Sequence, residues 1–334
     1  MAHILITGGA GFIGSHVADV LLKEEHRVWV LDDLSGGFQE NIPTGAIFIK
    51  GSILDYELLK NLFREHSFEY VFHLAAYAAE GLSHFIKRFN YENNLIGSVN
   101  LINLSILNGV KCFVFTSSIA VYGKNRLPMS EEIEPKPEDS YGIAKYAVEQ
   151  ELKISRAMFG LNHVIFRPHN VYGERQNMGD RYRNVIGIFM NQILQGEPMT
   201  IFGDGNQKRA FSYIGDIAPT IARSIQIPKA YNQIFNIGAE IPHTVNHLAK
   251  EVARAFDTEA KIKYLEPRNE VYEAYCDHSK ARNILKIQTD ISLTEGLVRM
   301  ADWAKRHGSR KSREFQNIEV PINLPSGWRC DDKS

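Results

Sequence analysis

A tyrosine and a lysine stand four residues apart in the segment Tyr141-Gly-Ile-Ala-Lys145. Residues at positions i and i+4 share one face of a helix, so both side chains would lie together near the start of a helix expected over 141–159. A lysine ammonium beside a phenol lowers the pKa of the phenol, which would make Tyr141 a usable general base. A surface pair of the same two residues is equally common, and the spacing alone leaves both interpretations open.

A serine ends the apolar run CFVFTSS at positions 112–118. In doubly wound α/β folds, ligands bind outside the carboxyl ends of the parallel strands. Ser118 would lie at such an end, where its hydroxyl could hold or relay a proton on a substrate oxygen. The alternative is a hydroxyl that only caps a turn.

A glycine-rich turn, GGAGFIG at positions 8–14, lies between an expected strand over 3–7 and an expected helix over 12–24. It satisfies the spacing G-x-G-x-x-G in the context that dinucleotide sites require. Glycine allows a close approach of backbone to a pyrophosphate, which the N–H groups of the following helix then face. Asp32 ends the next strand, where a carboxylate binds the adenosine ribose and repels a 2′-phosphate, so NAD is favoured over NADP. Asp33 shares this role or faces solvent.

These groups need a scaffold, and the chain alternates short apolar runs with amphipathic stretches. The pattern predicts strands over 3–7, 27–32, 70–75, 112–118 and 163–168, and helices over 12–24, 54–65, 93–108 and 141–159. Nearly continuous apolar strands between helices indicate a parallel sheet covered on both faces. With right-handed crossovers, the expected fold class is α/β, a Rossmann-type doubly wound parallel sheet.

A looser pattern follows residue 170 and predicts a smaller, mixed α/β substrate-binding lobe, with helices over 184–196, 245–256 and 293–306. The expected division assigns 1–168 to an NAD-binding Rossmann domain, to which the chain returns around 210–240, and 169–209 with 241–308 to the lobe. Residues 309–334 would form an extended or flexible tail.

The composition excludes several classes of protein. Of 334 residues, 44% are hydrophobic and 23% are charged, and a net charge of −1 gives no electrostatic basis for binding nucleic acid. Cys112, Cys276 and Cys330 form neither a disulfide framework nor a metal-ligand spacing. No apolar run approaches the roughly 20 residues of a membrane span, and the N-terminus has no basic segment before its first strand. We therefore expect a cytoplasmic protein with no metal, membrane or nucleic-acid partner.

Five segments occur in an order that is highly specific: TGGAGFIG at 7–14, LAA at 74–76, NN at 93–94, SSIAVYG at 117–123 and YGIAK at 141–145. Over residues 3–306 the chain resembles the extended short-chain dehydrogenase/reductases, the NAD-dependent nucleotide-sugar epimerase/dehydratase group. The resemblance implies that Ser118, Tyr141 and Lys145 are catalytic. It also implies a bound NAD, whose expected contacts are Gly8, Gly11, Phe12, Ile13, Gly14, Asp32, Asp33, Ser52, Ile53, Leu74, Ala75, Ala76, Asn94, Thr116, Tyr141, Lys145 and Pro168.

Two departures from the family concern the cofactor. Gly51-Ser52 stands where the family often has Gly-Asp, and Ala78 stands where the 4-epimerases commonly have a lysine.

Within the family, the residues after the catalytic serine distinguish the reactions. The 4,6-dehydratases carry Asp-Glu there and the sugar-acid decarboxylases a Glu, whereas this chain has Ile119 and Ala120, which cannot transfer a proton. The 3,5-epimerases and deoxysugar synthases use a Cys after the serine motif, and none of the three cysteines lies there. The pattern that remains resembles the UDP-hexose 4-epimerases and implies reversible oxidation at C4 of a UDP-hexose or UDP-hexuronate. A 2-epimerase, a reductase, a dehydratase and a non-catalytic NAD-binding protein are the alternatives.

The resemblance also implies a nucleotide-sugar site, of which Ser118 is one member. Asn170 matches an asparagine that contacts the substrate phosphate. Arg209 matches an arginine that binds the diphosphate, a task that suits a planar guanidinium. Arg268 and Glu270 resemble a pair that holds diphosphate and ribose, with a spacing one residue tighter than the commonest form.

Three features have more modest interpretations. His73 lies on an apolar strand, where a hydrogen-bonded core histidine is favoured over a ligand. Glu80 or His84 could touch the hexose, but a role in loop structure is favoured. In the family, helices like those over 93–108 and 141–157 form a four-helix bundle between subunits, so a homodimer is expected.

Overall fold

The computed structural model describes residues 1–268, 271–287, 291–312, 314–325 and 328. A seven-stranded sheet lies at its centre, with every neighbouring pair parallel, in the order β11-β6-β5-β4-β1-β2-β3. The order reverses between β1 and β4, and doubly wound folds bind dinucleotides in the crevice at such a point. The predicted fold class is confirmed. The strands are β1 (His3–Thr7), β2 (Arg27–Asp32), β3 (Ile47–Lys50), β4 (Tyr70–His73), β5 (Cys112–Thr116), β6 (His163–Pro168) and β11 (Gln233–Ile237).

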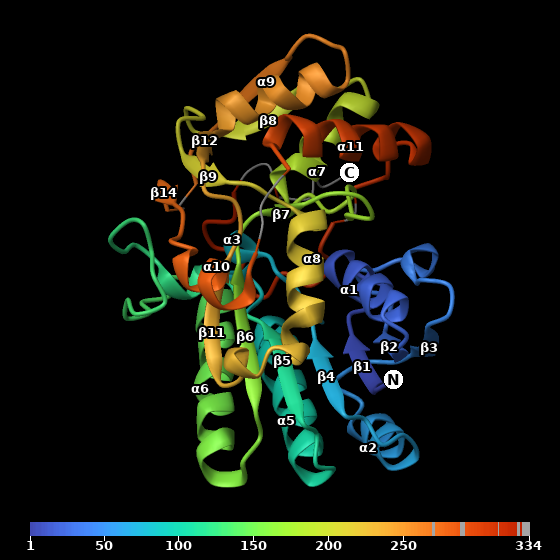
Figure 1. Ribbon diagram of the computed structural model, residues 1–334. Helices are drawn as coiled ribbons and strands as arrows, with labels where there is room; N and C mark the ends of the chain where they lie inside the picture. Colours follow the sequence, from blue (N-terminus) through green and yellow to red (C-terminus); the bar gives the residue numbers. More distant parts are fainter. Residues whose placement is uncertain (269–270, 288–290, 313, 326–327, 329–334) are drawn as a thin grey trace.

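Alternate residues of the strands supply two cores, one on each face of the sheet. On one face, Ile4 and Ile6 share a cluster with residues of α1 (Phe12–Lys23) and α8 (Ile214–Arg223). On the other face, Leu5 shares a cluster with residues of α2 (Tyr56–Glu65), α5 (Gly97–Leu107) and α6 (Ser140–Phe159). The sheet is therefore covered on both sides by helices, which are labelled in Figure 1.

The helix expected over 93–108 begins earlier, at Lys87, and contains a π-helical turn. α4 (Lys87–Tyr91) passes into a π-helical turn (Glu92–Ile96) before α5 continues. Such turns are frequent at functional sites because they redirect a side chain. Here Asn94 is buried. Short 3₁₀ turns occupy Gln39–Asn41, Ile119–Tyr122, Ser224–Gln226 and Pro228–Ala230.

A smaller lobe lies beyond the carboxyl ends of the strands, in the upper part of Figure 1. Between lobe segments the chain returns to the sheet through α8 and β11, and α10 (Ser279–Leu285) packs near β11. The lobe helices are α7 (Val185–Leu194), α9 (Val245–Ala255) and α11 (Leu293–His307). Its strands pair as β7 (Val171–Tyr172) with β10 (Ser212–Tyr213), β8 (Met199–Phe202) with β13 (Ile262–Leu265), and β9 (Lys208–Ala210) with β12 (Pro242–Thr244) and β14 (Glu273–Ala274).

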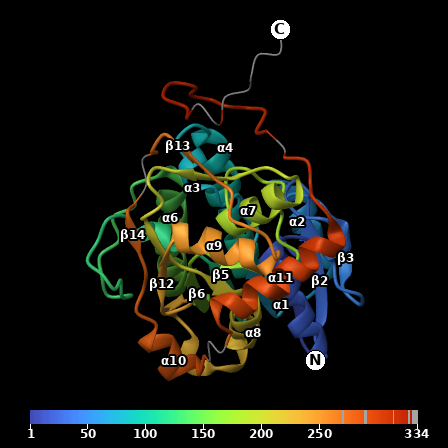
Figure 2. The same cartoon turned by 90° about the horizontal axis from the view of Figure 1, so that it is seen from above.

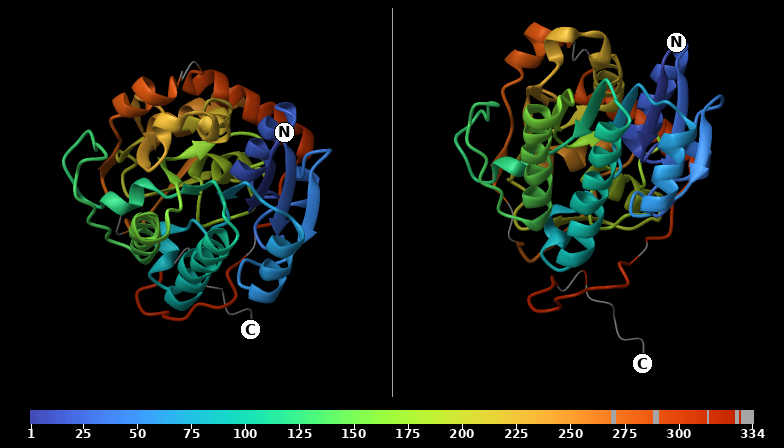
Figure 3. Two further views of the ribbon diagram at one scale, coloured as in Figure 1. Left: turned by 60° about the horizontal axis from the view of Figure 1, so that its bottom comes forward. Right: turned by 90° about the horizontal axis from the view of Figure 1, so that it is seen from below.

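The chain does not end at α11 but turns back toward the sheet domain. In Figure 2 this last segment runs from α11 along one side of the molecule and past α4 and the short helix α3 (Glu80–Ser83). Figure 3 shows it crossing the same side from two further directions. In the described ranges, no helix combines the length and the apolar character that a bilayer crossing needs.

Candidate active site

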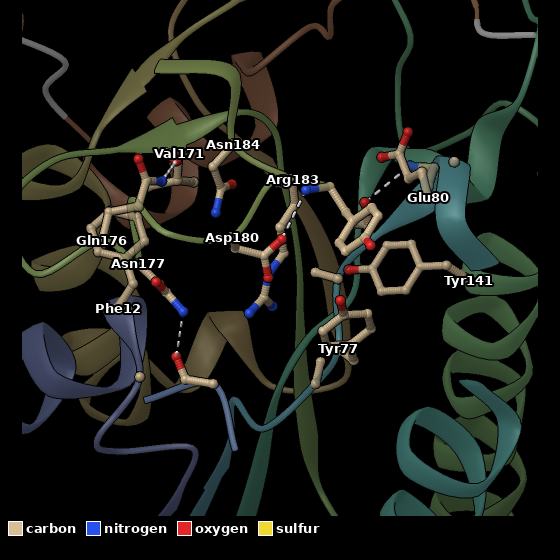
Figure 4. Close-up of a pocket in the computed structure, with 18 of the residues that line it drawn as sticks. Phe12, Tyr77, Glu80, Tyr141, Val171, Gln176, Asn177, Asp180, Arg183 and Asn184 are labelled. Atoms are coloured by element: carbon tan, nitrogen blue, oxygen red, sulfur yellow. Dashed lines mark hydrogen bonds and ion pairs between the residues drawn. The ribbon is translucent and has the colours of Figure 1, made fainter. Parts of the chain in front are cut away.

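A cleft of about 1710 Å³ lies between the carboxyl ends of the strands and the lobe. It is lined by the glycine turn after β1, by the ends of β2, β4, β5 and β6, by the first turns of α6 and by a lobe loop at 176–186. Figure 4 shows how side chains from these segments converge. Small-molecule sites usually measure about 300–1,000 Å³, so this cleft has room for a cofactor and a substrate together.

The glycine turn packs too closely to accept larger residues. Gly8 has a φ of +72°, and a Cβ there would lie 2.7 Å from the Cα of Ala75. A Cβ on Gly14 would lie 2.2 Å from the carbonyl oxygen of Gly8. The N-terminus of α1 therefore starts directly beside the end of β1 and lines the cleft through Gly11, Phe12 and Ile13. Unpaired N–H groups at a helix N-terminus fit the pyrophosphate of a dinucleotide.

Two carboxylates at the end of β2 have different surroundings. Asp32 is buried, and its oxygens accept hydrogen bonds from the backbone N–H groups of Ala10 (3.0 Å) and Leu34 (2.8 Å). Burial raises the pKa of Asp32, and these hydrogen bonds oppose the rise. Asp33 is exposed, and its carboxylate accepts from the N–H of Ser35 at 2.8 Å. Both residues line the cleft. The carboxylate of Asp32 is fixed by backbone hydrogen bonds, whereas that of Asp33 is exposed to solvent.

The structure brings Ser118, Tyr141 and Lys145 together on the cleft wall. Asp139 caps α6 by accepting from the N–H of Gly142 at 2.8 Å, which fixes the turn that carries the tyrosine. The lysine Nζ lies 5.8 Å from the centre of the tyrosine ring and donates to the carbonyl oxygen of Thr116 at 2.9 Å. The serine Oγ accepts from the N–H of Ala120 at 3.1 Å. Ser118 thus caps a turn and also lines the cleft.

Burial dominates the titration of this group. It raises the pKa of Tyr141, with the Glu80 carboxylate adding to the rise, and the Ser118 hydroxyl and the Arg183 guanidinium opposing it. Burial lowers the pKa of Lys145 to about 7. We expected the lysine to lower the pKa of the phenol. Instead the pKa of Tyr141 is raised, because the buried site disfavours both the phenolate and the ammonium.

The remaining expected cofactor contacts line the cleft, with one exception. Asn94 lies behind the wall instead, where its side chain accepts from the N–H of Tyr77 (2.9 Å) and donates to the carbonyl of the same residue (3.1 Å). The π-helical turn points this amide at the loop after β4, so it shapes the cleft without lining it. The other remaining contacts expected for the cofactor line the cleft: Ser52, Ile53, Leu74, Ala75, Ala76, Thr116 and Pro168.

Three of the four further residues expected to hold the substrate line the lobe side of the cleft. Asn170 donates from Nδ2 to the carbonyl of Ala210 at 3.1 Å. The Arg209 guanidinium is held by backbone carbonyls, including that of Tyr272 at 3.0 Å. Arg268 lies with its guanidinium carbon 4.8 Å from the ring centre of Phe202. The fourth, Glu270, lies outside the described residues.

Sequence reasoning did not single out a cluster that lies beside Tyr141. Arg183 donates from Nε to the Asp180 carboxylate at 2.6 Å, and its guanidinium lies 4.8 Å from the ring centre of Tyr77. These residues and Tyr141 line the same part of the cleft, as Figure 4 shows. They belong to the loop at 177–184 and to the loop after β4. No periodic pattern marks these loops, so only the folded chain brings them together.

The structure shows the surroundings of His73 and Glu80, for which the sequence favoured structural roles. His73 is a core residue as expected, since its ring nitrogens bond the hydroxyls of Thr7 and Ser98, each at 2.8 Å. Glu80 starts α3, lines the cleft and acts on the pKa of Tyr141. Glu80 therefore lines the candidate site and is also part of the loop after β4.

Comparison with known proteins agrees with this geometry. The sequence model of the NAD dependent epimerase/dehydratase family matches residues 4–238. A UDP-glucose 4-epimerase of Mycolicibacterium smegmatis is 33% identical over 307 residues, which are 90% of this chain and 97% of that protein. Two solved structures are also similar. A UDP-glucose 4-epimerase of Thermotoga maritima, solved with UDP-glucose, has a TM-score of 0.87 and 37% identity over 91% of this chain and 99% of its own. A UDP-glucuronic acid 4-epimerase of Bacillus cereus, solved with UDP-glucuronic acid and NAD, has a TM-score of 0.84 and 29% identity over the same shares of the two chains.

Proposed function

This chain belongs to the NAD-dependent epimerase/dehydratase family, and from that premise we propose that it interconverts the C4 epimers of a UDP-linked hexose or hexuronate. The observation that carries the proposal is the grouping of Ser118, Tyr141 and Lys145 beside the glycine turn, next to Ile119 and Ala120. Ser118, Tyr141 and Lys145 are side chains that suit the reversible oxidation of a hydroxyl. The two apolar residues offer no group for the proton transfers of an elimination or for assisting a decarboxylation.

The side chains suggest the following course. Tyr141 in its phenolate form takes the proton of the sugar 4-hydroxyl, while the Ser118 hydroxyl holds that oxygen by a hydrogen bond. An NAD held by the glycine turn and Asp32 would supply the hydride acceptor for C4 and the hydride donor for the reverse transfer. After the 4-keto sugar has presented its other face, Tyr141 gives the proton back. One proton and one hydride leave and return, so substrate and product have the same mass.

The lobe supplies the grip on the nucleotide in this proposal. Arg209 and Arg268 line the cleft as cations suited to a diphosphate, and Asn170 adds an amide on the same side. Holding the nucleotide here leaves the sugar free to turn over between the two halves of the reaction.

The test is incubation of purified protein with UDP-glucose, UDP-N-acetylglucosamine and UDP-glucuronate, without added cofactor, followed by mass spectrometry and NMR. A C4 epimer of unchanged mass is expected, and the fastest substrate identifies the group at C6 and C2. A product lighter by one water would indicate a dehydratase instead, and consumption of added NADH a reductase.

The Tyr141→Phe variant tests the chemical role of the phenol. We expect kcat to fall by about 10²- to 10⁴-fold, the usual contribution of a positioned general acid–base, while the dissociation constant for UDP stays within twofold. Full turnover in this variant would exclude the proposed mechanism.

We further propose that the protein is a homodimer of the cytoplasm. Exposed apolar residues lie eleven positions apart on each of two neighbouring segments, Ile96 and Leu107 before and on α5, and Ile143 and Ile154 on α6. Eleven residues make about three helical turns, so each pair shares one face and the faces could pair with a second copy. Sedimentation should therefore give twice the chain mass.

Cys112 and Cys276 are buried and free, which suits a reducing compartment such as the cytoplasm.

A further inference from the structure

The segment after α11 crosses the mouth of the cleft. We call its described residues, 309–312, 314–325 and 328, the C-terminal strap. Between residues 310 and 317 it supplies seven of the residues that line the cleft, namely Arg310, Lys311, Ser312, Glu314, Phe315, Gln316 and Asn317. Its path past α3 and α4 is visible in Figures 2 and 3.

The first part of the strap joins the lobe to the NAD-binding side. The backbone N–H of Arg310 donates to Oδ1 of Asn191 on α7 at 2.8 Å, and Nδ2 of the same asparagine donates back to the Arg310 carbonyl at 2.9 Å. The Arg310 guanidinium lies 3.8 Å from the ring centre of Phe38 and pairs with Glu40 at 2.7 Å. Both partners belong to the segment after β2.

The middle part is held at the start of α4. The carboxylate of Glu319 accepts from the backbone N–H groups of Arg88 (2.7 Å) and Phe89 (2.8 Å). The Phe315 ring lies 4.9 Å from that of Phe89, and its N–H donates to the hydroxyl of Tyr182 at 3.1 Å. These contacts fix the course of the chain toward its last described residue.

That residue, Trp328, is inserted between the two halves of the molecule. Trp328 is only 4% exposed, and its ring centre lies 5.3 Å from that of Tyr182. On the other side it abuts Gly81 of α3, where a Cβ would come within 3.0 Å of the indole. The guanidinium carbon of Arg268 lies 5.9 Å from the Trp328 ring centre and 4.8 Å from that of Phe202.

We propose that Trp328 is a positioning residue for substrate binding, which holds the Arg268 guanidinium in place for the nucleotide diphosphate. The inference rests on the proposed function, because it takes a UDP-sugar as the ligand. An arginine side chain has about 2 kcal/mol of rotamer entropy to lose on binding. Aromatic rings beside the guanidinium restrict that freedom before the ligand arrives, by packing and by cation–π attraction. The strap thus supplies a positioning residue from a part of the chain outside both the sheet and the lobe.

The experiment measures the binding of UDP to the full-length, NAD-loaded protein by calorimetry. Trp328→Ala should raise the dissociation constant about tenfold, and Trp328→Phe should restore most of the affinity because it keeps an aromatic face. Trp328→Leu fills much of the space without a π face, and should bind as weakly as Trp328→Ala. Ile322→Ala is the matched control, since that strap residue is 72% exposed. Its dissociation constant should stay within twofold of the parent value.

A double-mutant cycle separates positioning from simple loss of packing. If Trp328 acts through Arg268, the variant with both Trp328→Ala and Arg268→Ala should bind UDP no more weakly than Arg268→Ala alone. In turnover with the fastest UDP-sugar, KM should rise in Trp328→Ala while kcat changes by less than twofold. Additive effects in the cycle, or equal affinities of Trp328→Leu and the parent protein, would overturn the inference.

The readout distinguishes this inference from the proposed function. If the parent protein binds UDP and the Trp328 variants bind it equally well, only the role of Trp328 fails. If the parent protein does not bind UDP, the UDP-sugar assignment fails and takes the role of Trp328 with it.

Discussion

We propose that the choice between NAD and NADP depends on Asp32. Its carboxylate is fixed by the N–H groups of Ala10 and Leu34, so it cannot turn away from a 2′-phosphate at the adenosine ribose. We expect Asp32→Asn to lower the preference for NAD over NADP at least tenfold, about 1.4 kcal/mol, because the amide keeps the shape and loses the charge. Competitive reconstitution of the stripped protein measures this ratio. Asp33→Ala removes an exposed carboxylate nearby and should leave the ratio unchanged, so an equal effect of both variants would remove Asp32 from this role.

Residues with a repeated spacing or a strand end beside them could be predicted from the sequence. Tyr141 and Lys145 stand one helical turn apart, and Ser118 follows an apolar strand, so the fold brings them to one wall of the cleft. Arg183 and Trp328 lie in segments without periodicity. Their places depend on contacts with Tyr77 and Arg268, which are distant in the chain, and no local pattern specifies such pairings.

At the scale of elements, a buried ion pair locks α6 against β6. Glu149 accepts from Arg167 Nε (2.9 Å) and Nη2 (2.5 Å), and from the hydroxyl of Ser117 (2.6 Å). Both charged side chains are at most 1% exposed. Since Glu149 stands one turn after Lys145 on α6, the pair also fixes the position of the helix that carries Tyr141 and Lys145.

Replacing one partner of this pair leaves the other charge buried and unpaired. Glu149→Gln should therefore lower the free energy of unfolding by about 3–5 kcal/mol, as measured by urea denaturation. Glu151→Gln, on the same helix and less buried, should change it by no more than about 0.5 kcal/mol. A small effect of Glu149→Gln would mean that the buried arginine finds another partner.

Most strands of the central sheet and most helices followed from hydrophobic periodicity, because the sheet is buried on both faces, but β3 and the short strands of the lobe were not predicted. The change from α-helix to π-helix and back within residues 87–107 was not predicted from the periodicity. A π-helical turn differs from an α-helix by where one carbonyl bonds, and apolar spacing does not record that choice. As a result, Asn94 lies against Tyr77 rather than in the cleft.

For the whole molecule, buried histidines link stability to pH. Burial lowers the pKa of His73 and His169 to about 3 and that of His163 and His278 to about 4. They come from the sheet, its carboxyl edge and the segment before α10, so the effect is not local to one element. In the unfolded chain each histidine titrates at about 6.5.

Between pH 6.5 and 4 the unfolded chain therefore binds more protons than the folded one, and the folded state loses stability as the pH falls. Asp32, Glu131 and Asp139, whose pKa values burial raises, oppose this trend in part. Urea unfolding at pH 7, 6 and 5 should show a free energy that declines below pH 6.5, by at most about 1.4 kcal/mol per pH unit for each histidine. His163→Gln removes one of these groups and should make the decline shallower, whereas His247→Gln, at an exposed position, should not. A stability that stays level or rises toward pH 5 would show that these histidines become protonated within the folded protein.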